Sequence, residues 1–296
     1  MIATGQFAAL PNGITLHYAS CGEPGRPLLL CLHGFPEYWG AWEDVLPAWG
    51  AGYYAVAPDL RGFNLSSRPD DVAAYRTREI VGDLLHLIQG LGYERATVVG
   101  HDWGGAAAWA LAIARPDLVE RLVVLNSPHP IPFARALAND PAQQAASAYM
   151  NRLRAPGAES RLAEDDFRRL EAFFLGMQRP ETPWFTPQRR ARYRAVWARG
   201  LTGGLNYYRA SPLYPPCGAD PGAGALRLDP TQFIVRAPAL VLWGMRDTAL
   251  LPPLLDGLAE LVPQLTIERL ANATHWLVHE EPAFIANRVL DFVGAR

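Results

Sequence analysis

The stretch Val98-Val99-Gly100-His101-Asp102-Trp103-Gly104-Gly105-Ala106-Ala107 decides the fold of this chain. The apolar run at its start predicts a buried strand, and the alanine-rich run from Trp103 to Ala114 predicts a helix. Glycines flank the turn between them, as in the pattern Gly-x-nucleophile-x-Gly, which holds one side chain on a sharp strand-to-helix turn. Glycine is needed there because a Cβ would clash where the chain folds back. The side chain presented is the carboxylate of Asp102, although these residues alone also allow an ordinary turn with a helix-capping aspartate.

Strands and helices alternate on both sides of this stretch. Short apolar runs predict strands at 14–18, 28–32, 53–58, 96–99, 122–125, 239–243 and 265–270. Apolar residues at helical spacing predict helices at 77–91, 103–114, 254–261 and 282–293. Repeated alternation of this kind predicts an α/β protein with a mostly parallel central sheet that is flanked by helices.

The alternation stops at Ser127-Pro128-His129-Pro130. From there to about Phe233 the chain is rich in arginine, proline and aromatic residues. Its helical segments, at 143–153, 164–174 and 187–198, have no buried strand between them. We therefore predict that residues 131–232 form a helical cap, inserted into a core domain made of residues 1–130 and 233–296.

Composition limits the function classes that this chain can belong to. Of its 296 residues, 50% are hydrophobic and 19% are charged, which is typical of a folded domain with a large core. The formal net charge of -2 gives no electrostatic reason to expect a nucleic-acid partner. All 27 basic residues are arginine, so a Schiff-base lysine and a Walker-type phosphate lysine are both excluded.

The sequence contains neither a membrane segment nor a metal-binding pattern that we recognise. No apolar stretch is long enough to span a bilayer, and the N-terminus lacks the basic start and apolar run of a signal peptide. Cys21, Cys31 and Cys217 are widely spaced and match no metal-ligand or redox pattern. We therefore expect a cytoplasmic protein with no metal site and no membrane contact.

Two more polar residues follow predicted strands at their carboxyl ends, where the sites of parallel sheets collect. Asp247 comes shortly after the strand at 239–243, and His275 lies in the turn after the last strand. An ester formed on Asp102 would need a base to activate water and a carboxylate to fix the tautomer of that base. Taken singly, Asp247 could cap the next helix and His275 could be structural. The order nucleophile, acid, histidine is that of the α/β-hydrolase fold, and we interpret the three as a catalytic set.

An oxyanion would be bound by backbone N–H groups just after the nucleophile and in an earlier His-Gly turn. Trp103 and Phe35 occupy these two positions. A cis peptide bond before Pro36 is consistent with the shape of the earlier turn. We expect Glu37 to cap a helix, and orientation of a water molecule is its alternative role.

The chain resembles the α/β-hydrolase-fold epoxide hydrolases, relatives of the haloalkane dehalogenases, in three segments: His33-Gly34-Phe35-Pro36-Glu37, Gly100-His101-Asp102-Trp103-Gly104-Gly105 and His275-Trp276-Leu277-Val278-His279-Glu280-Glu281-Pro282. The similarity runs over nearly the whole chain. It implies two cap tyrosines that donate hydrogen bonds to the epoxide oxygen. Tyr208, in Leu205-Asn206-Tyr207-Tyr208-Arg209, and Tyr149, several residues before Pro156-Gly157, match those positions. The alternative is that both are ordinary amphipathic cap residues, and Tyr207 is expected to pack.

The resemblance implies covalent catalysis in two steps without a metal or an organic cofactor. Asp102 attacks an epoxide carbon while the two tyrosines stabilise the departing alkoxide. Water that His275 activates, with Asp247 holding the histidine, then hydrolyses the ester to give a vicinal diol. The implied partner is a small apolar epoxide, and whether the protein is a monomer or a homodimer stays open. The residues expected to line the substrate pocket are Phe35, Trp103, Phe133 and Trp276.

Haloalkane dehalogenases are the first alternative, because they share the aspartate nucleophile and the tryptophan after it. In that family, two side chains hold the halide. One is the tryptophan after the nucleophile, and the other is either an asparagine after His-Gly or a second cap tryptophan. Phe35 replaces the asparagine here, so Trp184 or Trp197 would have to supply the second contact.

Two further alternatives use the same fold. Fluoroacetate dehalogenases hold the substrate carboxylate with arginines beside the nucleophile, where this chain has Trp103, Ala106 and Ala107. A non-catalytic ligand-binding or scaffold protein would have no need of a nucleophile, an acid and a histidine in register. Neither the haloalkane nor the fluoroacetate dehalogenases offer a reason for two cap tyrosines.

Overall fold

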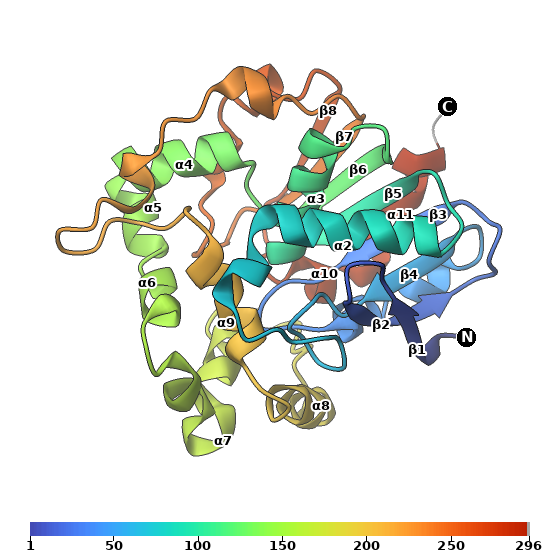
Figure 1. The fold of residues 1–296 in the computed structure, drawn as a ribbon, viewed down its shortest axis with the longest axis horizontal. Coiled ribbons are helices and arrows are strands. Elements are labelled where there is room, and N and C mark those ends of the chain that lie inside the picture. The colour runs from blue at the N-terminus through green and yellow to red at the C-terminus, as the bar shows by residue number, and fades with distance from the viewer. Residues whose placement is uncertain (295–296) are drawn as a thin grey trace.

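The computed structural model describes residues 1–294, and its centre is an eight-stranded sheet in the order β1-β2-β4-β3-β5-β6-β7-β8 (Figure 1). Strands β3 to β8 pair in parallel, whereas β1 and β2 are antiparallel to their neighbours. The predicted α/β class with a mostly parallel sheet is therefore confirmed. The strands are β1 (Ala3–Ala9), β2 (Thr15–Cys21), β3 (Leu28–Leu32), β4 (Tyr54–Pro58), β5 (Ala96–His101), β6 (Val119–Leu125), β7 (Ala239–Gly244) and β8 (Leu265–Leu270).

The central strands are buried because helices cover both faces of the sheet. Alternate residues point to opposite faces, so Leu28 and Leu30 join one apolar cluster while Leu29 and Cys31 join the other. Helices α2 and α3 lie across the face that Figure 1 turns to the viewer. The helices of this core are α1 (Leu46–Trp49), α2 (Thr77–Gly90), α3 (Trp103–Ala114), α10 (Leu277–Glu280) and α11 (Pro282–Gly294), with the short η1 (Trp39–Trp42) and η2 (Val72–Tyr75).

Between β6 and β7 the chain leaves the sheet and forms helices, with one isolated bridge between Cys217 and Asp220 in place of any strand. We call residues 130–233 the helical insert; it occupies the left side and the bottom of the molecule in Figure 1. Its assignment as a separate cap domain over 131–232 stays a prediction. Its elements are α4 (Pro130–Asn139), α5 (Pro141–Ala146), α6 (Tyr149–Arg154), α7 (Ala158–Leu175), α8 (Pro187–Trp197), α9 (Thr202–Ala210), η3 (Gly222–Ala225) and η4 (Pro230–Phe233).

Outside the insert, one strand was missed and one predicted helix was wrong. Strand β1 was not predicted, because its residues are mostly exposed and carry no apolar alternation; pairing with β2 defines it. The helix predicted at 254–261 is instead two short 3₁₀ helices, η5 (Pro252–Leu255) and η6 (Leu258–Glu260). Gly257 lies between them in a left-handed conformation, with φ 75°, and this ends the first helix.

Two predicted helices of the insert also differ from the structure. The helix predicted at 143–153 is divided into α5 and α6, and Gln143 closes the first of these by donating a 2.8 Å hydrogen bond to the Ser147 hydroxyl. The helix predicted at 164–174 starts earlier, at Ala158, and is interrupted at 164–167 by non-helical backbone. Within residues 1–294, none of the helices has both the length and the apolar composition to cross a bilayer.

Candidate active site

Asp102 stands on the turn between β5 and α3 in a strained backbone conformation, with φ 52° and ψ -121°. The turn is tight: a Cβ on Gly104 would lie 2.0 Å from the carbonyl oxygen of Leu32. The hydroxyl of Ser127 donates a 2.7 Å hydrogen bond to the carbonyl of Asp102 and holds the turn from below. The Asp102 side chain makes no capping bond to α3, so the alternative of a simple helix cap is wrong.

His275 lies between two aspartates at different distances. Its Nδ1 atom is 2.7 Å from Oδ2 of Asp247, and its Nε2 atom is 3.7 Å from Oδ2 of Asp102. Burial lowers the pKa of His275, but the carboxylates of Asp247 and Asp102 outweigh burial and raise it to about 9. Burial raises the pKa of Asp247, yet His275 and the hydrogen bonds to its carboxylate hold that pKa below the ordinary value. The sequence therefore folds so that all three residues meet, as expected from their strand-end positions.

The Asp247 carboxylate is fixed by three more donors. Its Oδ1 atom accepts hydrogen bonds from the backbone N–H groups of Ala249 and Leu250, at 2.8 and 2.9 Å. Its Oδ2 atom accepts one from Asn126, at 2.6 Å. Asp247 thus both caps its own turn and faces His275, so the two interpretations were not exclusive. Asn126 was missed in the sequence, where its signal is a polar residue directly after the buried strand β6.

The backbone N–H of Phe35 donates a 2.8 Å hydrogen bond to Oδ1 of Asp102, which places it where an oxyanion donor was expected. The peptide bond between Phe35 and Pro36 is cis, which the sequence allowed but did not determine. Trp103 is the first residue of α3, where the N–H groups of a helix have no intrahelical partner. Its ring packs edge-on against Tyr208, with the centroids 5.0 Å apart.

Tyr149 and Tyr208 come from α6 and α9 and face each other above Asp102, with their ring centroids 6.3 Å apart. Burial raises the pKa of both phenols well above the ordinary value, and the negative charge of Asp102 adds to this. Both hydroxyls therefore keep their protons and can donate them. Tyr207 points elsewhere, as expected, and donates a 3.1 Å hydrogen bond to the carbonyl of Arg61.

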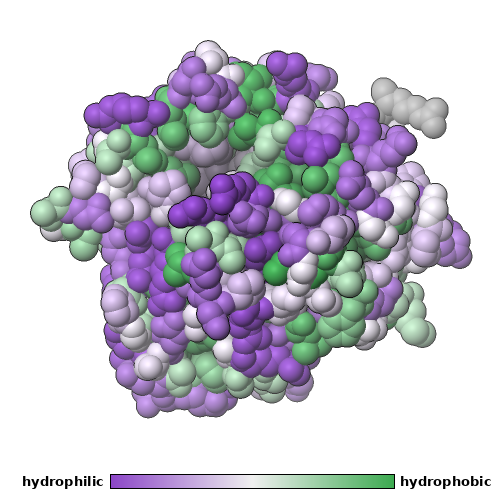
Figure 2. Space-filling model, in the orientation of Figure 1, coloured by the Kyte–Doolittle hydropathy of each residue, from purple (hydrophilic) through white to green (hydrophobic). Residues whose placement is uncertain are grey.

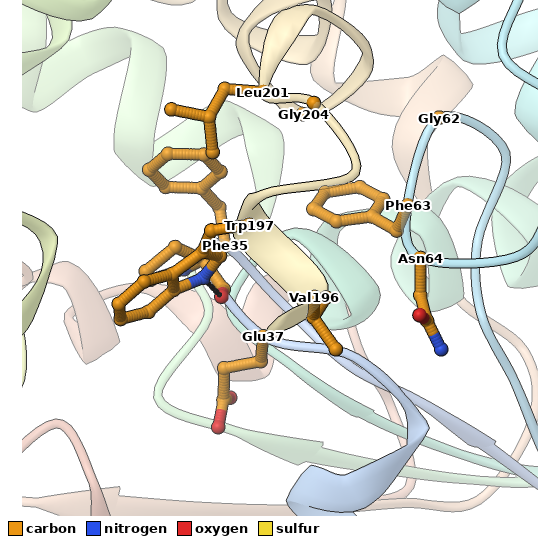
Figure 3. Close-up of a pocket in the computed structure, with 11 residues that line it drawn as sticks. Phe35, Glu37, Gly62, Phe63, Asn64, Val196, Trp197, Leu201 and Gly204 are labelled. Carbon is orange, nitrogen blue, oxygen red and sulfur yellow. Dashed lines mark hydrogen bonds between the residues drawn. The ribbon is translucent and has the colours of Figure 1, made fainter. Parts of the chain in front are cut away.

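Two glycines let α9 pack directly on the loops of the core. A Cβ on Gly203 would lie 2.3 Å from the Cα of Gly62, and one on Gly204 would lie 2.9 Å from the ring of Phe35. Beside Phe35, the core and the helical insert border a cavity of only about 20 Å³, which has room for about one water molecule (Figure 3). On its border, Trp197 Nε1 donates a 2.7 Å hydrogen bond to the Pro36 carbonyl. This close packing positions Tyr208.

Two larger cavities meet at the site, and Asp102, Tyr149 and Tyr208 line both. The first cavity is lined by His275 as well, and we call it the His275 pocket; its volume is about 310 Å³. The second is lined by residues of α2 and α3, and we call it the α2–α3 channel; its volume is about 710 Å³. The predicted pocket residues divide between them. The His275 pocket is lined by Phe35 and Trp276, and the α2–α3 channel by Trp103 and Phe133.

Glu37 is buried and does not cap a helix, so that expectation was wrong. Its Oε1 atom lies 2.7 Å from His279 Nε2 and accepts a 3.0 Å hydrogen bond from the Tyr193 hydroxyl. Its Oε2 atom lies 3.2 Å from His101 Nδ1, and the other nitrogen of that ring is 2.8 Å from the carbonyl of His275. Burial raises the pKa of Glu37, but the two histidines hold it well below the ordinary value. This buried network, which the sequence did not reveal, supports His275 from behind.

Neither of the two tryptophans considered as a second halide contact lines the cavities at Asp102. Trp184 stacks on His279, with the centroids 3.8 Å apart, and Trp197 is engaged with Pro36. The cysteines are free, and residues 1–294 contain no group of three His, Cys, Asp or Glu side chains that could hold a metal ion.

Comparison with known proteins identifies the family of this chain. The family model described as the alpha/beta hydrolase fold matches residues 27–282. The chain belongs to the α/β-hydrolase fold family. Among its α/β-hydrolase relatives, AB hydrolase superfamily protein YfhM of Bacillus subtilis is 36% identical over 286 residues, covering 95% of each chain. Epoxide hydrolase 3 of Xenopus tropicalis is 34% identical over 289 residues, covering 95% of this chain and 75% of the relative.

Solved structures of α/β hydrolases agree with this result. The Bacillus megaterium epoxide hydrolase in complex with an inhibitor has a TM-score of 0.89 at 32% identity, covering 98% of this chain and 100% of that one. An epoxide hydrolase from metagenomes of hot environments has a TM-score of 0.89 at 34% identity and covers 98% of both chains. The predicted α/β-hydrolase fold and the resemblance to epoxide hydrolases are both confirmed.

Proposed function

We propose that this α/β hydrolase is an epoxide hydrolase, which converts epoxides to vicinal diols through an ester on Asp102. One observation carries the proposal: Tyr149 and Tyr208 line both cavities together with Asp102, and burial raises the pKa of both phenols, which favours hydroxyls that keep their protons. A halide leaves as a stable anion, but an epoxide oxygen leaves as a basic alkoxide and needs a proton. The relatives named epoxide hydrolase support the same activity.

In the first step a carboxylate oxygen of Asp102 attacks an epoxide carbon, and the bond from that carbon to the ring oxygen breaks. The N–H of Phe35 holds Oδ1 of the carboxylate and orients the nucleophile. The ring oxygen takes a proton from Tyr149 or Tyr208, and the second hydroxyl stabilises it. General-acid assistance of this kind is worth roughly 10²–10⁴ in rate.

In the second step Nε2 of His275 removes a proton from a water molecule, whose oxygen attacks the ester carbonyl carbon of Asp102. The N–H groups of Phe35 and Trp103 stabilise the resulting oxyanion. Asp247 stabilises the protonated imidazole and keeps its Nε2 atom turned towards the ester. The intermediate then collapses: the bond from the carbonyl carbon to the ester oxygen breaks, and that oxygen takes the proton held by His275 to complete the diol. The carboxyl proton left on Asp102 is lost to solvent, and the tyrosine that gave up its proton in the first step regains one from solvent.

The test is a product assay with two substrates. We expect release of 1-phenyl-1,2-ethanediol from styrene oxide and no release of bromide from 1-bromobutane. Bromide without diol would instead indicate a haloalkane dehalogenase, and neither product would favour a non-catalytic binding protein. Neither Trp184 nor Trp197 lines the cavities at Asp102, which argues against the dehalogenase because neither supplies the second halide contact considered for it.

A further inference from the structure

The α2–α3 channel runs from Asp102 between the core and the helical insert. Its floor on α3 consists of Trp103, Ala106, Ala110, Ile113 and Ala114, which fall on one face of the helix. At 1.5 Å per residue, this face gives the channel a length of about 16 Å. The residues of α2 and of the insert that complete its apolar wall are Val81, Leu85, Phe133, Met150, Leu213, Leu226, Leu228 and Phe233. Small alanines on the floor and large apolar groups on the wall leave a long, mostly apolar space.

The far end of this channel opens beside Arg78 and Arg115. Each of these guanidinium groups already faces a carboxylate: Glu79 lies 2.8 Å from Arg78, and Asp117 lies 2.6 Å from Arg115. The exit is therefore not a free anion site. In Figure 2 a hollow bordered by hydrophobic residues is visible between the positions of α3 and α4. A neutral apolar chain fits this exit better than a carboxylate does.

The His275 pocket differs in size and in chemistry. It has less than half the volume of the channel, about 310 Å³ against 710 Å³. His275 lines this pocket and does not line the channel. Thr248 and the exposed Arg152 lie at this pocket beside His275, whereas the polar residues of the channel, Thr77, Ser127 and Ser211, lie among a larger set of apolar side chains. The water that His275 activates must approach from this side. A bulky substituent placed here would therefore occupy the space of that water.

We infer that the preferred substrates are epoxides with one long, neutral, apolar substituent, which lies in the α2–α3 channel, and with little or no substituent on the second epoxide carbon. This inference rests on the proposed epoxide hydrolase activity and names the substrate class of the same site. The two cavities beside Asp102 then have different roles. The channel binds the apolar chain of the substrate, and the His275 pocket admits water. Each methylene buried in the channel should contribute to binding until the chain reaches the exit.

The test on the unaltered enzyme is a series of substrates, with diol formation as the readout. We expect kcat/KM for 1,2-epoxybutane, 1,2-epoxyhexane, 1,2-epoxyoctane and 1,2-epoxydecane to rise about two- to fourfold per methylene. The isomer 5,6-epoxydecane, which has a chain on both carbons, should fall about tenfold or more below 1,2-epoxydecane, because the second chain must enter the smaller pocket. Replacing the terminal methyl group of 1,2-epoxydecane by a carboxylate should lower kcat/KM. A flat series, or equal values for the two isomers, would overturn the assignment.

A pair of matched variants locates the chain. Ala110→Trp fills the channel, and Ala145→Trp adds the same bulk at the His275 pocket. We expect the ratio of kcat/KM for 1,2-epoxydecane to that for 1,2-epoxybutane to fall about tenfold in Ala110→Trp and to be kept in Ala145→Trp. Thermal unfolding checks that each variant is folded. If Ala110→Trp is not folded, Ile113→Trp takes its place as the channel variant. An unchanged ratio in a folded channel variant overturns the substrate class alone, whereas absence of diol from every epoxide with the unaltered enzyme overturns the proposed function and this inference with it.

Discussion

The Nε2 atom of His275 lies 3.7 Å from Oδ2 of Asp102, beyond hydrogen-bond distance. A serine nucleophile would need a hydrogen bond to its base, but a carboxylate is already ionised and attacks without one. The separation leaves Nε2 available for a water molecule next to the ester. On the other side of the same ring, Asp247 is held at 2.7 Å. The two distances therefore fit the two roles that we propose, nucleophile for Asp102 and orienting acid for Asp247.

We predict that Asp102 carries the ester. In a single turnover with excess enzyme in oxygen-18 water, the label should enter the carboxylate of Asp102, because water attacks its carbonyl carbon rather than the epoxide. Peptide mass analysis of the fragment that contains Asp102 checks this. Label found only in the diol after that first turnover would mean that water attacks the epoxide directly and that no ester forms.

We predict that His275→Gln separates the two steps. Formation of the ester needs no base, whereas its hydrolysis does. The variant should therefore consume one equivalent of epoxide in a burst and then show almost no turnover. The ester should be visible as a mass increase of the intact protein. Asn126→Ala serves as a milder comparison, because it removes one of the hydrogen bonds that orient Asp247 and leaves the base in place. Turnover of His275→Gln at the parental rate would remove His275 from the mechanism.

The pH dependence of the second step follows from the charges around His275. Burial lowers its pKa, but Asp247 and Asp102 raise it to about 9 in the free enzyme, so the ring is protonated at neutral pH and must lose its proton to act as a base. Esterification removes the charge of Asp102, so the pKa of His275 should be lower in the ester than in the free enzyme. We expect the rate of ester hydrolysis, followed in single turnovers, to rise with pH along a limb whose apparent pKa is below 9. A limb with the same apparent pKa as that measured for His275 in the free enzyme would mean that Asp102 has no influence on this base.

The residues that the sequence allowed us to predict share one property: their position follows from local pattern. Asp102 sits between glycines, and Asp247 and His275 each follow an apolar strand, so parallel pairing alone brings them to one edge of the sheet. The structure places them together, and their catalytic roles stay predictions. The positions of Tyr149 and Tyr208 came from the resemblance to a family, because nothing in local periodicity distinguishes a tyrosine at a site from one in a helix core.

The residues that were missed depend on contacts between distant segments. Glu37 and His279 are 242 residues apart in the chain and 2.7 Å apart in space, and neither sequence segment indicates its partner. A buried glutamate is also unusual without compensating groups, so the default expectation for Glu37 was an exposed helix cap. The short 3₁₀ helices after β7 could not be distinguished from one longer helix, because the apolar spacing of Leu254, Leu258 and Leu261 is the same in both.

We predict that Gly203→Ala impairs the chemistry without touching a reacting group. The new Cβ would lie 2.3 Å from the backbone of Gly62, so α9 must shift and carry Tyr208 with it. Misplacement of a catalytic group by about 1 Å can cost on the order of 100-fold, and we expect a loss of about 10- to 100-fold in the rate of ester formation. The matched control is Gly90→Ala on α2, where a Cβ meets nothing within 4 Å, and which should keep its activity. Ester formation at the parental rate in folded Gly203→Ala would show that α9 packing does not position Tyr208.

The last prediction concerns the two tyrosines, because they separate epoxide opening from dehalogenation. Tyr208→Phe and Tyr149→Phe each remove one hydroxyl and preserve the packing of the ring, so each should slow ester formation while the second donor partly compensates. The double variant should lose roughly 10²–10⁴ in the rate of ester formation, the usual worth of general-acid assistance, although Asp102, Asp247 and His275 are untouched. The measurement is the single-turnover rate of ester formation on a terminal epoxide, with thermal unfolding to show that the variant is folded. Ester hydrolysis should change little, because the alkoxide is already protonated when that step begins. Unchanged ester formation in a folded double variant would falsify the epoxide hydrolase proposal and make the dehalogenase, whose leaving group needs no proton, the better account of the site.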